Sequence, residues 1–341
     1  MQLVEQHVID KADKRFAVID AAAFAAKNLY NAALYEVRQT FIFEGHYCST
    51  KELYHRMKHT DAYRALPGKV SNDVLRQLEK NWRAFFAALE AWKEDPSKFG
   101  GRPKLPKYKH KTKGRFLLTY DIQAISRRAL ARGLLTPSGL TIEVQTAHCR
   151  IKQARIVPRA GFYVVEIVYE EAEAAPVGNP ALYAAVDLGV DTLAALTSNK
   201  VGFAPRLVNG RVLKSYNQFY NKRRAELQAA LGHEGVTARM ERLTTKRTRR
   251  INHYLHAASK TIIALLAHEG IGTLIIGKNL RWKQEVELGR VNNQHFVQIP
   301  HARFIEMLHY KAERAGIQVV VQEESYTSKA SFLDARSVAD L

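Results

Sequence analysis

The sequence is poor in cysteine and in acidic residues. Its 341 residues include two cysteines, Cys48 and Cys149, without a CxxC pair, which argues against a disulfide scaffold or a cysteine zinc site and indicates a reducing compartment. No signal peptide is evident and no apolar run approaches about 18 residues, so membrane insertion is not expected. The chain has only 33 Asp and Glu residues but 52 Lys and Arg residues, which gives a formal net charge of +19. This excess favours a polyanionic partner, nucleic acid before an anionic membrane.

The N-terminal part of the chain predicts long helices. With 46% hydrophobic residues the chain can bury cores, and its length indicates two or three domains. Segments 20–43 and 70–95 carry apolar residues at helical spacing, the second with Ser71 as its predicted N-cap and Pro96 as its stop. The aromatic residues of the second helix indicate a buried stripe rather than a base-stacking surface. They are Trp82, Phe85, Phe86 and Trp92.

Two stretches concentrate positive charge. The segment 100–116, "GGRPKLPKYKHKTKGRF", cannot form a regular helix and is either a linker or a phosphate-contacting loop. Its single-signed charge favours nucleic-acid contact over a merely solvated surface. The residues concerned are Arg102, Lys104, Lys107, Lys109, Lys111, Lys113 and Arg115. The helical stretch 244–260 predicts a second nucleic-acid face. Its candidates are Lys246, Arg247, Arg249 and Arg250.

The remaining pattern predicts a multidomain α+β chain. Residues 115–170 show short strands separated by Gly and Pro turns, which suggest a small barrel or sandwich, and 171–180 is a plausible linker. From residue 181 the expected order is three strands, a long helical stretch, a strand, a helix and a strand. This is the order of an RNase H-like fold, a mixed sheet with flanking helices. The helical stretch spans 216–269, and the last helix and strand follow Pro300.

One acidic residue interrupts a strongly apolar run. In "AAVDLGVDTLAAL", residues 184–196, Asp187 is expected at the end of a buried strand. An aspartate there can cap a turn or form a salt bridge. RNase H-like nucleases instead place their first metal-binding aspartate on the first strand of the sheet. Two Mg²⁺ ions, with oxygen ligands, then activate a water and stabilise the leaving oxygen of a phosphodiester.

Several long motifs make the chain similar to a known family. They include "AAVDLGVDTLAAL", "PRLVNGRVLKSYNQFYNKRRAEL", "KRTRRINHYLHAASKTII" and "EESYTSKASFLD", with "KNLYNAALYEVRQTF" and "GRPKLPKYKHKTKGRF" in the N-terminal half. The chain resembles TnpB, the transposon-encoded RNA-guided endonuclease related to type V CRISPR effectors. The resemblance covers almost the whole chain.

The resemblance implies an architecture and an activity. A helical recognition segment, 20–96, would be inserted in a small OB-like β-barrel wedge formed by 1–19 and 97–178. A RuvC-like nuclease domain, 181–341, would follow. The family binds a guide RNA and a double-stranded DNA target, reads a short motif beside the target and cuts both strands with two Mg²⁺ ions. A prokaryotic, cytoplasmic and nucleoid-associated location follows, with the oligomeric state open.

The family's second carboxylate is displaced in this sequence. The family has a glutamate at the end of the fourth strand, where this chain reads "LIIGKNL" with Gly277 at the expected place. The predicted replacement is Glu324, with Glu323 as the alternative because successive strand residues face opposite sides. The fifth strand would lie two strand spacings, about 10 Å, from Asp187, which two metals can bridge. The predicted Mg²⁺ ligands are therefore Asp187 and Glu324.

A second departure concerns the third carboxylate. Family members continue into a cysteine zinc ribbon and a final helix that carries it, whereas Asp334 and Asp340 do not match that motif. We therefore expect a truncated chain without a zinc site that cuts weakly or not at all. An RNA-guided endonuclease and a catalytically dead RNA-guided DNA-binding protein both stay open. A non-functional truncated product also remains, and a DDE-type transposase is a weaker third possibility.

Overall fold

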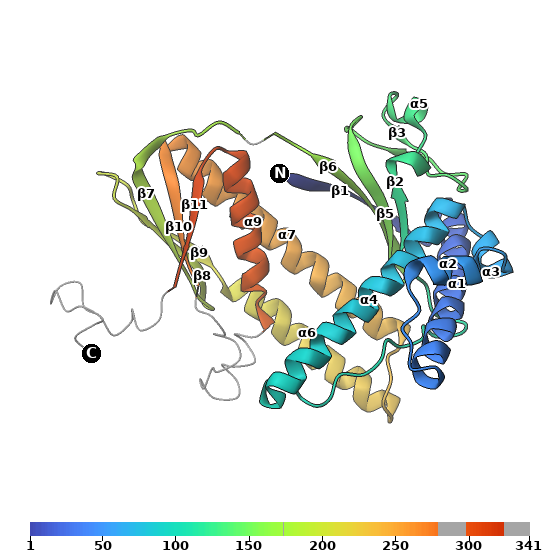
Figure 1. Ribbon diagram of the computed structural model, residues 1–341. Helices are drawn as coiled ribbons and strands as arrows, with labels where there is room; N and C mark the ends of the chain where they lie inside the picture. Colours follow the sequence, from blue (N-terminus) through green and yellow to red (C-terminus); the bar gives the residue numbers. More distant parts are fainter. Residues whose placement is uncertain (173, 279–297, 324–341) are drawn as a thin grey trace. The chain divides into compact units, whose positions relative to one another are not determined.

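The computed structural model describes residues 1–172, 174–278 and 298–323, which divide into two compact units (Figure 1). The first unit contains residues 2–171, and the second contains residue 172 onward with Met1. Each unit has its own apolar core. A separate core is what allows a unit to be stable by its own packing.

Two long helices dominate the first unit and agree with the sequence pattern. The helix α1 spans Phe16–Phe43 and α4 spans Gly68–Glu94, close to the predicted 20–43 and 70–95. Two shorter helices, α2 (Thr50–Met57) and α3 (Asp61–Arg64), connect them. The predicted aromatic stripe is partly confirmed, because Trp82 is fully buried against Phe41, Tyr47, Phe85 and Phe86.

The predicted N-cap of α4 is wrong. The N-cap is Pro67, four residues before Ser71, and Ser71 lies within the first turns of the helix. The hydroxyl of Ser71 is buried and donates a hydrogen bond of 2.7 Å to the carbonyl of Tyr63. Proline suits a helix start because its missing N–H would be unpaired there anyway. A serine with an alternative backbone acceptor can therefore sit inside the helix.

The predicted barrel is also wrong, since the main sheet of the first unit is open. Its order is β1-β6-β5-β2, and every neighbouring pair is antiparallel. The strands are β1 (Gln2–Asp10), β2 (Leu118–Asp121), β5 (Ile151–Arg159) and β6 (Phe162–Glu170). A separate two-stranded sheet joins β3 (Leu134–Leu135) to β4 (Val144–Gln145). Closure would need the edge strands β1 and β2 to pair, but β2 has only four residues and packs on α1 and α4.

The strand β1 ties the start of the chain to this sheet. It pairs along its whole length with β6, from Gln2 opposite Glu170 to Asp10 opposite Phe162. All of α1 to α4 lies between β1 and β2 in the sequence. The helices and the sheet share one apolar core.

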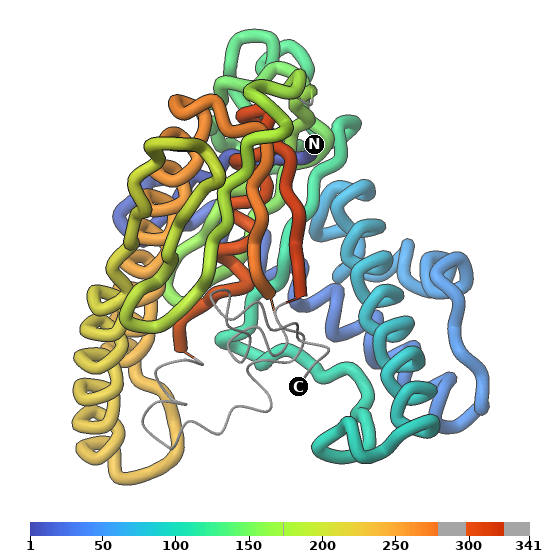
Figure 2. Tube along the Cα trace, turned by 90° about the vertical axis from the view of Figure 1, so that its left-hand side faces the viewer, coloured from blue at the N-terminus to red at the C-terminus, as the bar shows by residue number. Residues whose placement is uncertain are grey.

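The second unit contains a five-stranded mixed sheet with the order β11-β10-β7-β8-β9. Its strands are β7 (Asn179–Leu188), β8 (Thr192–Ser198), β9 (Arg206–Asn209), β10 (Ile271–Gly277) and β11 (Gln318–Gln322). The first three are antiparallel to one another, while β10 is parallel to β7 and β11 is parallel to β10. Figure 2 shows β10 and β11 side by side in orange and red. The fifth strand thus lies beside the fourth, away from the first, as the sequence predicted.

Three helices of the described residues accompany this sheet. The predicted stretch 216–269 is two helices, α6 (Arg211–Leu231) and α7 (Ala238–His268), separated after Gly232. Gly232 has φ 71° and closes α6 in the left-handed conformation, which glycine adopts without strain. The third helix, α9, spans His301–Arg314. Apolar residues of α7 and α9 share one core with β7 and β10.

Candidate functional site

Asp187 lies on the central strand of the five-stranded sheet, one residue before its end. Its neighbours Val186 and Leu188 are 1% and 6% exposed and belong to the core. Since successive side chains of a strand alternate, Asp187 points to the opposite face, where it is exposed. The alternation of "AAVDLGV" therefore places one carboxylate on the open side of the sheet.

Residues of all five strands line a cavity of about 460 Å³ on this face, among them the ends of β7, β10 and β11. Parallel pairing aligns Ile276 with Val186, so the next pair brings Gly277 beside Asp187. Gly277 in turn pairs with Gln322 of β11. Asp187, Gly277 and Gln322 consequently form one row across β7, β10 and β11, and all three line the cavity.

The position of the second carboxylate stays a prediction. Glu324 lies outside the described residues, whereas Glu323 lines the same cavity as Asp187. The strand ends at Gln322, whose carbonyl accepts a hydrogen bond of 2.9 Å from the Lys278 backbone N–H. Gln322 itself was missed by sequence reasoning. Only the pairing register shows that its side chain shares the row of Asp187.

A buried histidine holds the turn that follows Asp187. His301, at the start of α9, is fully buried, and its Nε2 lies 2.9 Å from the carbonyl oxygen of Gly189. A carbonyl can only accept, so Nε2 carries the proton in this contact. Gly189 is required here because a Cβ would lie 2.7 Å from the carbonyl oxygen of Thr192. Sequence reasoning missed His301, whose only signal was a histidine at a helix start between apolar residues.

The basic segment 100–116 is irregular, as predicted, and is anchored by its backbone to α1. Asn31 donates to the carbonyl of Lys109 at 2.9 Å and accepts from its N–H at 2.8 Å. The buried ammonium group of Lys27 donates to the carbonyl of Lys111 at 2.6 Å. The anchoring leaves most of the predicted basic side chains exposed. These are Arg102, Lys104, Lys107, Lys109, Lys111 and Lys113.

Arg115, the last member of the predicted set, forms an internal ion pair. Its guanidinium donates to both carboxylate oxygens of Asp20, at 2.8 and 2.7 Å. The hydroxyl of Tyr163 donates to the same carboxylate at 2.7 Å. These hydrogen bonds, Arg115 first, lower the pKa of Asp20 below its usual value. Arg115 therefore links the basic segment to α1 and β6.

We expect Asp20→Asn to destabilise the protein by about 1–3 kcal/mol at pH 7, because it breaks a bidentate, charge-assisted contact. A lowered folded-state pKa gives stability above the unfolded pKa of about 3.9 that is lost as pH falls through the folded pKa. The difference between wild type and variant should thus shrink below about pH 4. Urea unfolding at pH 7 and pH 3 measures it.

The matched control is Asp61→Asn, an exposed carboxylate that forms no ion pair among the described residues. It should change the unfolding free energy by less than about 0.5 kcal/mol. An Asp20→Asn effect as small as this, or one that grows in acid, would contradict the assigned role of the ion pair.

The second predicted basic set, on α7, divides in two. Lys246, Arg249 and Arg250 are exposed. Arg247 is half-buried, donates to the side-chain oxygen of Asn217 at 2.7 Å and lies 4.9 Å from the ring centre of Tyr220. Burial lowers its pKa. Arg247 thus packs α7 against α6, while the other three face solvent.

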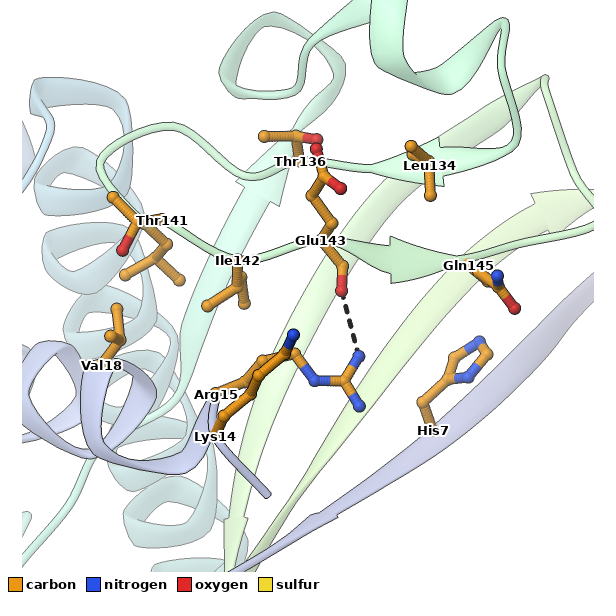
Figure 3. Close-up of a pocket in the computed structure, with 11 residues that line it drawn as sticks. His7, Lys14, Arg15, Val18, Leu134, Thr136, Thr141, Ile142, Glu143 and Gln145 are labelled. Carbon is orange, nitrogen blue, oxygen red and sulfur yellow. Dashed lines mark hydrogen bonds between the residues drawn. The ribbon is translucent and has the colours of Figure 1, made fainter.

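A larger cavity, about 990 Å³, lies in the first unit beside β1 and β4 (Figure 3). Figure 3 shows Arg15 reaching the carbonyl of Glu143, a contact of 3.0 Å. Arg15 also forms hydrogen bonds with both carboxylate oxygens of Asp13, which lower the pKa of Asp13 to about 2. Its charge is matched internally, so we assign no chemistry to this cavity.

Two features are absent from the described ranges 1–172, 174–278 and 298–323. No group of three or more His, Cys, Asp or Glu gathers there in a way that could hold a metal ion. In the same ranges no helix combines the length and the apolar character that a membrane crossing needs.

Comparisons with known proteins agree with this geometry. The family profile OrfB_IS605, described as "Probable transposase", matches residues 166–283, and "Cas12f1-like, TNB domain" matches residues 301–332. The chain is a TnpB-like protein. The first match includes the strand of Asp187 and the row position Gly277. The second includes β11 and its following glutamates.

One solved structure supports the same fold. The TnpB-like chain superimposes on a chain of the cryo-EM structure of the Cas12f1–sgRNA–target DNA complex with a TM-score of 0.56 and 14% identity. This match covers 92% of this chain and 75% of that one. A CRISPR–Cas12f ternary complex matches with a TM-score of 0.35 and 12% identity, over 91% and 72% of the two chains. No curated protein matches the chain.

Proposed function

We propose that this TnpB-like protein binds a guide RNA and a double-stranded DNA target and carries an RNase H-like, RuvC-type nuclease domain. One observation carries the proposal: Asp187 stands on the open face at the end of the central strand of a β11-β10-β7-β8-β9 sheet. This strand order, with three antiparallel strands followed by two parallel ones, is the order expected for that fold. The exposed carboxylate would be its first metal ligand.

The domain boundaries form part of the proposal. Residues 1–19 and 97–178 would form the wedge, 20–96 the recognition segment and 181–341 the nuclease domain. In support, β1 and β2 belong to one sheet although all of α1 to α4 lies between them. The helices are thus inserted into the sheet's sequence, as a recognition segment in a wedge would be.

The proposed partners follow from charge and from the structural neighbour. The neighbouring Cas12f1 chain was solved with an sgRNA and target DNA. This chain has a net charge of +19, and its basic segment exposes six cationic side chains along an anchored backbone. Such a strip suits the phosphates of an RNA–DNA heteroduplex, which a guided protein contacts by backbone rather than by sequence. A cytoplasmic, nucleoid-associated location is part of this proposal.

The residues around Asp187 offer the kind of donor atoms that a magnesium ion binds. Asp187 and Glu323 are carboxylates and Gln322 offers an amide oxygen, all on one cavity. Mg²⁺ prefers oxygen ligands and often uses one or two carboxylates while keeping several waters. These residues therefore suit one ion. A second ion needs a further carboxylate, for which Glu324 is the proposed source.

The residues of this chain would hold the ion, fix the local backbone and limit the access of water. When bound, Mg²⁺ supplies a Lewis acid for a phosphodiester oxygen and lowers the pKa of a bound water. Asp187 would hold the ion at the end of a strand fixed on both sides by pairing. His301 would keep the turn after Asp187 in place through Gly189. The apolar side chains Ala185, Ala195 and Ile275 would limit water in the cavity.

A second candidate function is a catalytically dead, RNA-guided DNA-binding protein. The observation that favours it is Gly277, which occupies the row position beside Asp187 and has no side chain to bind a metal. In this case the protein would occupy its DNA target as a roadblock without cutting it.

Purified protein should carry RNA and lose it steeply as salt rises. Neutralising phosphates with Lys and Arg releases counterions, so affinity falls with a power of the salt concentration. Sequencing of the copurified nucleic acid, and its release between about 0.1 and 1 M NaCl, measures both properties. Protein that carries no nucleic acid and binds none at about 0.1 M salt would rule out both candidate functions.

A further inference from the structure

The helices α6 and α7 enclose a small cavity whose lining is aromatic on one side and cationic on the other. Its volume is about 240 Å³. The α6 side presents Tyr216, Phe219 and Tyr220, which share a face because they are three and four residues apart. The α7 side presents Lys246, Arg247 and Arg250 at the same spacing. Ser215 and Leu243 complete the described lining.

Internal contacts hold part of this cavity rigid. Arg247 lies over the Tyr220 ring and is bound to Asn217, while the hydroxyl groups of Tyr220 and Thr244 lie 3.1 Å apart. Arg250 lies 5.4 Å from the ring centre of Tyr216. The helices thus meet through two arginine–aromatic pairs, and little side-chain freedom remains to be lost on binding.

Three side chains at the cavity keep exposed surface, including Arg250 of the second pair. Phe219 is 61% exposed although it is a large apolar side chain. Lys246 and Arg250 are exposed and form no ion pair among the described residues. None of the eight described lining residues is acidic. The amide nitrogen of Asn217, fully buried beside Arg247, has no hydrogen-bond partner in the described part of the chain.

We propose that this cavity binds one unpaired nucleotide of a single-stranded RNA. The base would stack on Phe219 and Tyr216, and its phosphates would contact Lys246 and Arg250. Aromatic side chains and arginine planes are the usual platforms for unstacked bases. A volume of about 240 Å³ lies below the range of about 300–1,000 Å³ typical of small-molecule sites, which suits a single ring system.

RNA is the favoured ligand for a physical reason. Bases of a DNA duplex stay stacked and paired, whereas RNA loops, bulges and ends offer bases that can enter a cavity. The identity of that RNA as a guide rests on the proposed function. The cavity itself requires only a single strand with one accessible base.

The test uses the full chain, freed of nucleic acid, and a short unstructured RNA with one 2-aminopurine, a base whose fluorescence falls when it stacks. Phe219→Ala should weaken RNA affinity about tenfold and abolish the fluorescence quenching. Phe219→Trp should retain both. Arg250→Ala should weaken affinity more than Arg242→Ala, which removes the same charge from an exposed site on the same helix. Phe43→Ala, which removes another exposed phenylalanine, is the second control.

The outcomes separate this inference from the proposed function. Wild-type protein that binds no RNA overturns both. Wild-type protein that binds RNA, with Phe219→Ala and Arg250→Ala indistinguishable from their controls, overturns only the nucleotide site. Equal, Phe219-dependent quenching with a DNA strand of the same sequence overturns the assignment to RNA. Unchanged thermal unfolding of each variant confirms that the fold is retained.

Discussion

Asp187→Ala is expected to lower whatever Mg²⁺-dependent cleavage of target DNA the RNA-loaded protein shows by at least about 100-fold, with RNA affinity unchanged. A metal ion contributes several kcal/mol of charge stabilisation in the transition state, and each 1.36 kcal/mol is a factor of ten in rate. Asp187 is exposed at the strand end and far in sequence from the basic segment, so guide binding should not depend on it. Single-turnover cleavage and an RNA-binding titration measure the two properties separately, and terbium luminescence reports metal binding at Asp187.

Variants of the two glutamates after β11 identify the second ligand. Glu324→Ala should be as inactive as Asp187→Ala if Glu324 is the second ligand, as the sequence predicts, and Glu323→Ala should then be milder. If Glu324→Ala cuts normally while Glu323→Ala is inactive, the relocated glutamate is misassigned. If all of these variants and Asp187→Ala cut, the RuvC-type site is wrong. A wild-type protein that binds metal through Asp187 but does not cut would be the dead DNA-binding form.

Replacing Lys104, Lys107, Lys109 and Lys111 together by alanine is expected to weaken nucleic-acid binding up to about 1,000-fold at about 0.1 M salt. Each lost phosphate contact reduces the slope of log affinity against log salt by about 0.7 to 0.9, so four contacts remove about 3. The fold should survive, because Asn31 and Lys27 hold this segment by its backbone rather than by the lysine side chains. Binding titrations at several salt concentrations give the slope.

The matched control replaces four other exposed lysines of the same unit. Lys11, Lys51, Lys69 and Lys80 form no ion pairs among the described residues, and their removal changes the net charge equally. The control variant should keep most of the salt dependence. If both quadruple variants lose affinity and slope alike, the protein responds to net charge and the segment 100–116 is an ordinary solvated surface.

The N-terminal helices show how much of the fold the local sequence pattern predicts. The periodicity of 20–43 and 70–95 predicted α1 and α4 closely, because burying one apolar stripe is what stabilises such helices. The cap at Ser71 was wrong because serine suits an N-cap and an internal hydrogen bond to a carbonyl equally well. The break after Gly232 was missed because one glycine does not interrupt the apolar spacing of 216–269.

The candidate nucleic-acid contacts show the same limit of prediction from local sequence. The sequence marked Arg115 and Arg247 as candidates by charge alone, and the structure places both in internal contacts with Asp20 and Asn217. Composition cannot distinguish such an arginine from an exposed one, because the distinction depends on an acceptor about 95 or 30 residues away in the chain.

The sequence by itself determined the element order from residue 181 onward, apart from the break between α6 and α7, and the placement of Asp187 at a strand end, because these follow from apolar periodicity and strand alternation. Only the tertiary structure decided that the first sheet stays open, that Gly277 and Gln322 stand in the row of Asp187, and that His301 supports the turn at Gly189. These features depend on pairing and packing between residues distant in the sequence. Local pattern carries no register for such contacts, since shifting a strand by one residue reverses every side chain without changing its periodicity.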